Sequence, residues 1–577
     1  MKIRWVLVLA LCVPGYTAES DDVILRAMRA EIERARGLKF ANLESPYYVE
    51  VKIDDLTAFM ASATLGGLIS ANRTHHRSPR IELRVGDYKF DNTNYVGAGY
   101  NYGGNYDVER LPLEDNYDLL RRYLWLAIDR SYKSAVEAIA RKRAALRNLT
   151  TNEQPDDFAK APAIQTLEPV KAVKFDEEGW KSRVKALSAI FAKYPQLRAS
   201  SVEYAGMDSL GYMANTEGTA IRIQEDISYV RARASIQAPD GMMLRDAVTI
   251  HSGKPGVIAS DAEIIRDFTE LAENVSALAK APIGEAYNGP VLFEKEAAAQ
   301  IFAQIIGRNL ALTRRPVMEP GRPGAFPSSE LEGRFGARVL PEWMDVVDDP
   351  TQTQWRGNPL FGHYTVDADG VEPKPLALVE KGVLKNFLLT RQPVRGFNGS
   401  NGRARLEGPF GANAAAFGNL FVRASETVPL AELKKKLIEI CKTRDKPYGI
   451  LIRKMDFPSS ASFEEMRRLI TGSSSGSARP VSIPILAYRI YPDGREELIR
   501  GLRFRGFNAR SFKDILAASG EISMFEYLEN GSQMALMGSS GSVAQCTVIA
   551  PSVLIDDLEM ERMEEEFPKI PIVPPPT

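Results

Sequence analysis

The chain has 577 residues, of which 44% are hydrophobic, 25% charged and 9% aromatic, a composition typical of a large globular protein with several domains. Lys and Arg number 73 against 74 Asp and Glu, so the net charge of −1 lacks the basic excess typical of nucleic-acid-binding proteins. Its 3 Cys and 4 His exclude a disulfide-rich framework and a cysteine-rich zinc module.

The first segment has the three parts of a secretory signal. Lys2 and Arg4 precede an apolar run over residues 5–13. Small residues then lead into a polar sequence that begins at Glu19. The apolar run is well short of the roughly 20 residues that cross a bilayer as a helix. We therefore expect residues 1–18 to be a cleaved signal peptide and the mature protein to be exported, periplasmic or secreted, with no integral membrane segment.

Residues 19–150 are predicted to form an N-terminal α+β domain. Segments 22–38 and 117–148 carry apolar residues at helical spacing. Segments 47–53 and 80–88 alternate apolar and polar residues, as strands do.

Residues 151–285 are predicted to form a second unit, a helix with an antiparallel meander. A Pro-containing linker over 150–167 comes first, and β-rich runs fill residues 199–252. Turn sequences at 215–218 and 239–241 separate these runs, which predicts hairpins. The helices expected on either side of the meander cover residues 177–194 and 259–279.

Residues 286–560 are predicted to form a β-rich C-terminal domain, and residues 561–577 a Pro-rich tail. A strand runs into a helix that ends near Gly307, and Lys381 and Gly382 form a hairpin turn. The other elements expected are a loop-rich region over 314–362, strands 374–380, 384–389, 449–455 and 481–491, and helix 431–446. The fold class is thus α+β, with predominantly antiparallel sheets, flanking helices, an N-terminal α/β part and a β-rich C-terminal part.

Two motifs do not fit the context that their chemistry requires. Residues 472–476 have the Gly-x-Ser-x-Gly spacing of a hydrolase nucleophile elbow, but a helix enters the segment and a strand leaves it, the reverse of that site. Residues 97–104 are rich in Tyr and Gly but lack the Lys-Ser/Thr of a phosphate loop. We interpret both as surface loops. Two less favoured alternatives remain: a metal-independent hydrolase that uses Ser473–Ser475, and a partner-binding role for the Tyr-rich loop.

The His and Cys residues show no metal-binding pattern. No two His residues have the spacing that places imidazoles on one face of a helix, so we interpret all of them as structural or surface groups: His75, His76, His251 and His363. Cys12 leaves with the signal peptide, and Cys441 and Cys546 are predicted to be separate buried thiols.

Four segments, in order along the chain, together resemble the TldD/PmbA family of peptidases. They are residues 288–307, the hairpin over 380–391, the loop over 397–403 and residues 550–556. In the metal-bearing branch of that family, a His-Glu-x-x-x-His motif opens the helix of the first segment. A Cys nearer the C-terminus completes the zinc site, and the Glu activates the metal-bound water.

Placed on this chain, the family motif falls on Phe293, Glu294 and Ala298, so only the Glu is kept. Phenyl and methyl groups offer no lone pair to a metal. Cys546 lies too close to Pro551 to match the family thiol. The resemblance therefore implies the TldE/PmbA-like branch, which lacks the zinc motif, and it implies no catalytic, cofactor-binding or metal-binding residue in this chain.

The resemblance also sets expectations for partners. Zinc is expected only in a TldD-like metallopeptidase subunit that pairs with this chain to cleave peptides, and no nucleic-acid partner is expected. Glu294 becomes a helix-start residue favoured by the helix dipole, and Phe293 fills the space left by metal and imidazole. The alternative is a homodimer or larger homo-oligomer that binds peptides or acts as a scaffold after losing peptidase activity.

Overall fold

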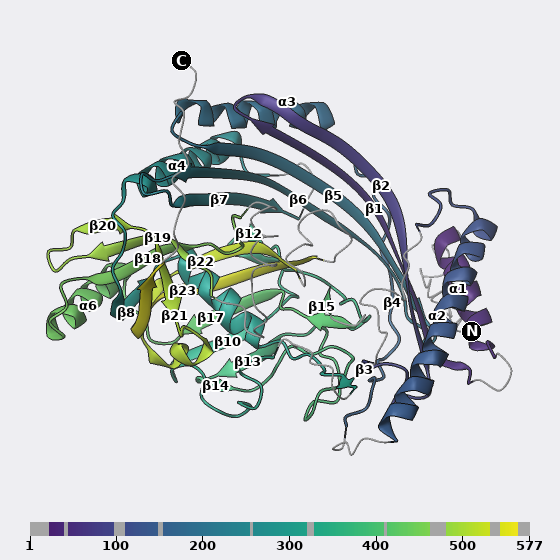
Figure 1. Cartoon of the computed structure of the whole chain (residues 1–577). Coiled ribbons are helices and arrows are strands. Elements are labelled where there is room, and N and C mark those ends of the chain that lie inside the picture. Colours follow the sequence, from purple (N-terminus) through teal and green to yellow (C-terminus); the bar gives the residue numbers. More distant parts are fainter. Residues whose placement is uncertain are drawn as a thin grey trace, which may run out of the picture.

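The structure is a computed structural model, and it describes residues 22–39, 44–96, 110–147, 154–253, 258–319, 328–408, 412–461, 481–530 and 543–563. A long, curved N-terminal sheet carries helices on its outer side, and a larger C-terminal sheet lies under its concave side (Figure 1). This confirms the α+β class with predominantly antiparallel sheets. Among the helices in these ranges, none has the length and apolar character that crossing a membrane requires.

The N-terminal sheet is built from a hairpin and a meander that pair side by side. Strand β1 pairs antiparallel with β5, which gives the order β2-β1-β5-β6, with β7 and the short β4 both on β6. The segments on either side of the predicted boundary at residue 150 therefore share one sheet. Its strands are β1 (Pro46–Thr64), β2 (Gly67–Val85), β4 (Gln165–Leu167), β5 (Ala199–Asn215), β6 (Ala220–Gln237) and β7 (Met243–Ser252).

Strands β1 and β2 extend far beyond the predicted segments 47–53 and 80–88. Their far ends meet at a turn where Leu65, Leu68 and Ile69 are 60%, 42% and 62% exposed. The outer half of β2 has no buried face, so the alternation that marks a strand is missing from its sequence. The predicted meander and both of its turns are confirmed.

Four helices cover the convex face of this sheet in two pairs. Helices α1 (Val23–Arg36) and α2 (Tyr117–Leu146) pack on one end through an apolar cluster that includes Leu25, Leu120 and Leu124. Helices α3 (Glu177–Ser188), which continues as a 3-10 turn to Lys193, and α4 (Asp261–Lys280) pack on the other end. Each begins close to its predicted position, where a side-chain cap such as Asp22 or Ser260 satisfies a free backbone N–H.

The C-terminal sheet has the order β14-β13-β10-β17-β23-β8-β18-β19-β20, and β21 and β22 also pair with β23. All of its pairs are antiparallel except β17 with β23 and β8 with β18. Its strands are β8 (Tyr287–Phe293), β10 (Met344–Asp348), β13 (Leu376–Glu380), β14 (Val383–Leu384), β17 (Asn419–Ala424), β18 (Gly449–Met455), β19 (Pro484–Ile490), β20 (Glu496–Ile499), β21 (Leu502–Arg505), β22 (Ile515–Asn530) and β23 (Val543–Arg562).

Two helices pack against this sheet. Helix α5 (Glu296–Ile301) continues as a π-helical turn over Phe302–Gly307 and is buried along its whole length, whereas α6 (Leu430–Thr443) packs through a separate apolar cluster. Three two-stranded sheets lie in the loops: β3 (Tyr95–Val96) with β9 (Val317–Met318), β11 (Gln354–Trp355) with β12 (Asn358–Pro359), and β15 (Ala404–Glu407) with β16 (Asn413–Ala415).

The C-terminal half agrees with the predicted elements only in part. The hairpin turn is confirmed, with Lys381 and Gly382 both at positive φ. The strand expected over 384–389 is wrong beyond Leu384, because the chain leaves the sheet there. Strand β23 includes the first two residues of the predicted tail. Predictions for the signal peptide, the loops at 97–104 and 472–476, and the rest of the tail fall on residues outside the described ranges.

The two halves are joined by a buried polar cluster around Phe158, which we call the interdomain cluster. The guanidinium groups of Arg84 from the N-terminal half and Arg391 from the C-terminal half lie 3.7 and 4.1 Å from the centre of the Phe158 ring. Arg391 also donates to Glu217 at 2.8 Å, and its backbone N–H donates to Asp369. This one arginine therefore contacts the linker, the N-terminal sheet and its own domain.

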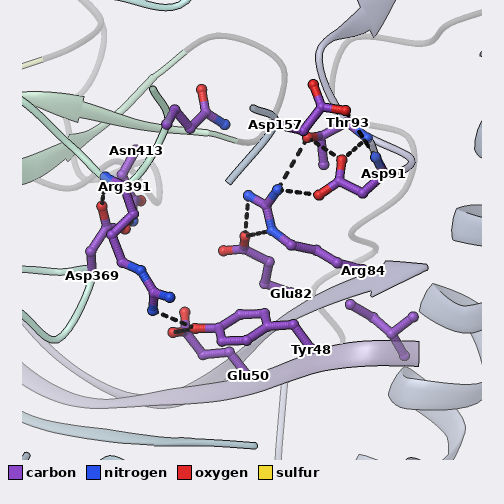
Figure 2. A network of polar contacts seen from close by, with 12 residues as sticks. Tyr48, Glu50, Glu82, Arg84, Asp91, Thr93, Asp157, Asp369, Arg391 and Asn413 are labelled. Atoms are coloured by element: carbon purple, nitrogen blue, oxygen red, sulfur yellow. Dashed lines mark hydrogen bonds and ion pairs between the residues drawn. The ribbon is translucent and has the colours of Figure 1, made fainter. Parts of the chain in front are cut away.

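Figure 2 shows that the cluster leaves few charges unpaired. Arg84 donates to Glu82 and Asp91, each at 2.7 Å, and the Tyr48 hydroxyl donates to Glu50 at 2.6 Å. Buried charges are stable only when they are paired and hydrogen-bonded in this way. The cluster therefore fixes how the C-terminal domain sits against the sheet.

We predict that Phe158→Ala destabilises the protein by about 3 to 5 kcal/mol, because it removes a buried ring and the surface on which two arginines lie. Urea unfolding followed by circular dichroism measures the loss. The control is Phe335→Ala, since Phe335 is 57% exposed, and this change should cost about 0.5 kcal/mol or less. An unfolding midpoint for Phe158→Ala equal to that of the unmodified chain would contradict the assignment.

Candidate functional site

Strand β8 leads into the central helix of the C-terminal domain, where the resemblance places the degenerate motif. Phe293 is the last residue of β8 and pairs with Ile452 and Val553 on its neighbours. Helix α5 begins only at Glu296, after Lys295 with φ of 45°. The expectation that the motif at Phe293 opens a helix is therefore wrong, because a strand end and a turn lie between its first and last positions.

Phe293 and Ala298 are parts of the apolar core. Neither is exposed to solvent, and the Phe293 ring lies 5.9 and 5.6 Å from the rings of Phe504 and Phe507. The Phe293 ring thus packs against other aromatic rings, and these side chains offer no polar atom to an ion placed beside it.

Glu294 is held by two cations. Its carboxylate lies 3.0 Å from Arg453 Nε and 3.1 Å from Lys434 Nζ. Both cations also pair with Glu496. Because α5 begins two residues later, Glu294 is not a helix-start residue, and the dipole role expected for it is replaced by these ion pairs. Each oxygen of the Glu294 carboxylate is therefore engaged by one cation.

The central helix changes geometry just beyond the predicted motif. Residues Phe302–Gly307 form a π-helical turn, a rare feature that is often found at functional sites. Arg308 follows directly, and its guanidinium donates to both carboxylate oxygens of Glu529 at 3.1 and 3.0 Å. Ala303, Gln304 and Arg308 repeat the spacing of the family motif within one helical run, a signal that the sequence analysis missed.

A buried thiol lies in the same place. Cys546 on β23 pairs in register with Tyr527 on β22, and its Sγ donates to the carbonyl oxygen of Phe417 at 3.2 Å. Burial raises the pKa of Cys546 to about 12, so the thiol stays protonated at neutral pH. We call Arg308, Phe417, Tyr527, Glu529 and Cys546 the Arg308 cluster.

The Phe417 ring closes the cluster against the π-helical turn. A Cβ atom added at Gly307 would lie only 2.3 Å from this ring, so Gly307 lets the two elements meet. The Tyr527 hydroxyl donates to Glu529 at 3.2 Å, which gives the carboxylate a second partner.

The residues of this region do not fit a zinc ion. Zinc needs three or four ligands with free lone pairs, and a Cys ligand must be a thiolate. Here Glu529 is bound by Arg308, whose guanidinium would repel a cation, and Cys546 and Glu529 are the only side chains of this cluster of a type that commonly binds zinc. Among the residues that the structure describes, no three His, Cys, Asp or Glu side chains are arranged to hold a metal.

The His and Cys residues that the sequence analysis considered as metal ligands are scattered over the structure. His75 pairs with Asp55, and His363 Nδ1 lies 2.7 Å from the Pro350 carbonyl oxygen. Burial lowers the pKa of His251 to about 3, so this side chain is neutral at physiological pH. Cys441 and Cys546 are both free and buried, which confirms that they are separate thiols.

Acidic groups lie on the concave face of the N-terminal sheet and on the domain beneath it. Asp54 on β1 and Glu225 on β6 are exposed, yet desolvation by the surrounding protein raises the pKa of each carboxyl. Desolvation also raises the pKa of Glu526, on β22 of the C-terminal domain, to about 7. Above these raised pKa values the carboxylates are charged and can attract a cationic group. Among the described residues, this face contains no arrangement typical of a nucleophile and base.

Comparisons with known proteins show that the central helix and Arg391 of the interdomain cluster lie in one segment that matches a known family. Residues 286–456 match the family described as the PmbA/TldA metallopeptidase C-terminal domain. A metalloprotease from Archaeoglobus fulgidus is 37% identical over 78 residues, which are 14% of this chain and 17% of that protein. A metalloprotease from Methanothermobacter thermautotrophicus is 25% identical over 195 residues, 34% of this chain and 39% of that protein. The matched segments thus span less than half of either relative.

One solved structure is similar over almost the whole chain. TldE from Thermococcus kodakarensis superposes with a TM-score of 0.55 and 12% identity, covering 93% of this chain and 100% of that chain. At this identity the likeness shows a shared fold, which also includes the residues outside 286–456. Residues 286–456 therefore belong to the PmbA/TldA metallopeptidase C-terminal domain family, and almost the whole chain has the fold of a TldE structure.

Proposed function

We propose that this protein is an exported, non-catalytic subunit of a peptidase whose zinc is carried by a TldD-like partner. The Arg308 cluster supports the proposal most strongly. At the end of the helical run that has the motif spacing stands an arginine bound to Glu529, so the cluster offers fewer than the three protein ligands that a zinc site requires. The fold shared with a protein named TldE agrees with this role.

In this role the chain holds and orients a peptide for the partner. Strand β2 is an edge strand, and its outer half, which includes Arg73 with 59% of its side chain exposed, lies open to solvent. An extended peptide can add to such an edge by backbone hydrogen bonds. The exposed carboxylates of Asp54 and Glu225 attract a positively charged group to the concave face of the same sheet.

A second candidate function is a homo-oligomeric peptide-binding or scaffold protein. Large apolar side chains are exposed together around the β1–β2 turn: Met60, Leu65, Leu68 and Ile69. Exposed apolar groups that lie together often mark a protein–protein interface. In this alternative the interface joins copies of the chain, and no metal-bearing subunit is needed.

The proposed function predicts that activity depends on the partner. Co-expressed with a TldD-like protein that has an intact His-Glu-x-x-x-His, the tagged chain should co-purify with it, and the complex should hydrolyse casein. A chelator should abolish this hydrolysis, because the metal is the only source of the nucleophile. The isolated chain should have no chelator-sensitive activity.

Two variants provide the controls for this experiment. Glu294→Gln should leave the activity of the complex within about twofold, because Glu294 forms ion pairs and is not a base. The Glu→Gln change in the partner's motif should abolish activity. Hydrolysis of casein by the isolated chain with one bound zinc would refute the proposal. A stable homodimer that Ile69→Glu dissociates, together with no recovery of a TldD-like partner, would favour the second candidate.

Export predicts a shortened mature protein. Expressed with its own N-terminus in a bacterium with a secretion system, the chain should be recovered outside the cytoplasm with Glu19 as its first residue, because cleavage follows Ala18. N-terminal sequencing and intact mass measure this. Replacing Leu7 and Leu9 with Arg should block export by disrupting the apolar run. Recovery of a cytoplasmic chain that still contains residues 1–18 would show that this segment is not a signal.

A further inference from the structure

An open cleft of about 550 Å³ is lined by residues of the two N-terminal helices, α1 and α2. These helices lie on the outer side of the N-terminal sheet, away from the C-terminal sheet (Figure 1). Helix α1 supplies two of its lining residues and α2 supplies five. The lining consists of Glu31, Arg34, Asp118, Leu119, Arg121, Arg122 and Trp125. No role described so far uses this cleft.

A buried carboxylate holds two of the arginines in place. The Glu31 side chain is 2% exposed and accepts from Arg34 Nε at 2.6 Å and from Arg121 Nε at 2.8 Å. The Nη2 atom of Arg34 is buried and has no hydrogen-bond partner. Because Glu31 fixes both side chains, their remaining N–H groups are positioned before any ligand arrives, which lowers the entropy that binding would cost.

The rest of the cleft combines a third arginine with an aromatic surface. Arg122 is exposed, and it forms no ion pair or hydrogen bond with another residue in the described ranges. Trp125 follows three residues later on the same face of α2, with 43% of its surface exposed. Leu119 lies about one turn before Arg122 and adds apolar surface. Trp and Arg are among the residue types most enriched at the positions that dominate binding energy.

The charges of the lining indicate the ligand. Three arginines face two carboxylates, Glu31 and Asp118, so the lining carries a net charge of +1. Such a cleft favours a monoanion over a dianion such as phosphate, and the planar guanidinium groups match a carboxylate. The exposed indole and Leu119 favour an apolar group next to that carboxylate.

We propose that this cleft binds a carboxylate that adjoins an apolar side chain, as at the C-terminus of a peptide. The carboxylate binds to Arg122 and to the arginines held by Glu31, and the apolar side chain packs on Trp125. Only the choice of a peptide rests on the proposed function. The experiment measures binding to the isolated chain, so its result does not depend on a metal-bearing partner.

The test titrates the full chain with four probes by calorimetry. They are N-acetyl-Gly-Leu-Phe with a free carboxylate, the same peptide as its amide, N-acetyl-Gly-Glu-Phe amide and inorganic phosphate. The free acid should bind, and the first amide should bind at least about tenfold more weakly, the effect of losing one charge-assisted pair. Equal binding of the Glu-containing amide identifies a side-chain carboxylate as a ligand too, whereas weaker binding restricts the site to chain ends.

Variants locate the binding site. Arg122→Ala and Trp125→Ala should each weaken binding of the free acid by about tenfold, and Arg122→Lys should weaken it less because it keeps the charge. The matched control is Arg141→Ala, an exposed arginine further along α2 that does not line the cleft. Equal affinity for the acid and the amide, unchanged affinity in both Ala variants, or binding of phosphate alone would overturn the proposal.

Discussion

The ion pair between Arg308 and Glu529 is the interaction on which our interpretation of this protein depends. It lies at the end of the π-helical turn, where the central helix meets β22 and β23. A guanidinium in this position neutralises the carboxylate and excludes a second cation, while the protonated Cys546 beside it donates to a backbone carbonyl. The helix end is therefore a packed core element in which the guanidinium and the carboxylate balance each other's charge.

The interdomain cluster gives the same fold its shape. Arg391 lies within the family segment 286–456, yet it contacts Phe158 of the linker and Glu217 of the N-terminal sheet. A small number of buried, paired charges thus decides how the sheet's concave face and the C-terminal domain face each other. Glu225 of the sheet and Glu526 of the C-terminal domain, on these two surfaces, both have pKa values raised by desolvation.

The sequence predicted the fold well wherever one face of an element is buried. Helices such as α4 and the β5–β7 meander could be located because their apolar residues repeat with the right period. The outer half of β2 lacks that signal, since it faces solvent on both sides. At the candidate site, the sequence identified the right helix but not Arg308, because its importance comes from Glu529 and Cys546, more than 200 residues away. Such long-range contacts leave no periodic pattern.

The central claim is that this chain's own atoms do not hold zinc, and anomalous diffraction tests it most directly. Crystals of the isolated chain, grown with zinc and measured on both sides of the zinc absorption edge, should show no ordered zinc beside Arg308, Cys546 or Glu294. Zinc bound to protein lies about 2.0 to 2.3 Å from its ligands, so a bound ion would be unambiguous. A strong anomalous peak at that distance from Cys546 Sγ, with Arg308 displaced from Glu529, would contradict the account.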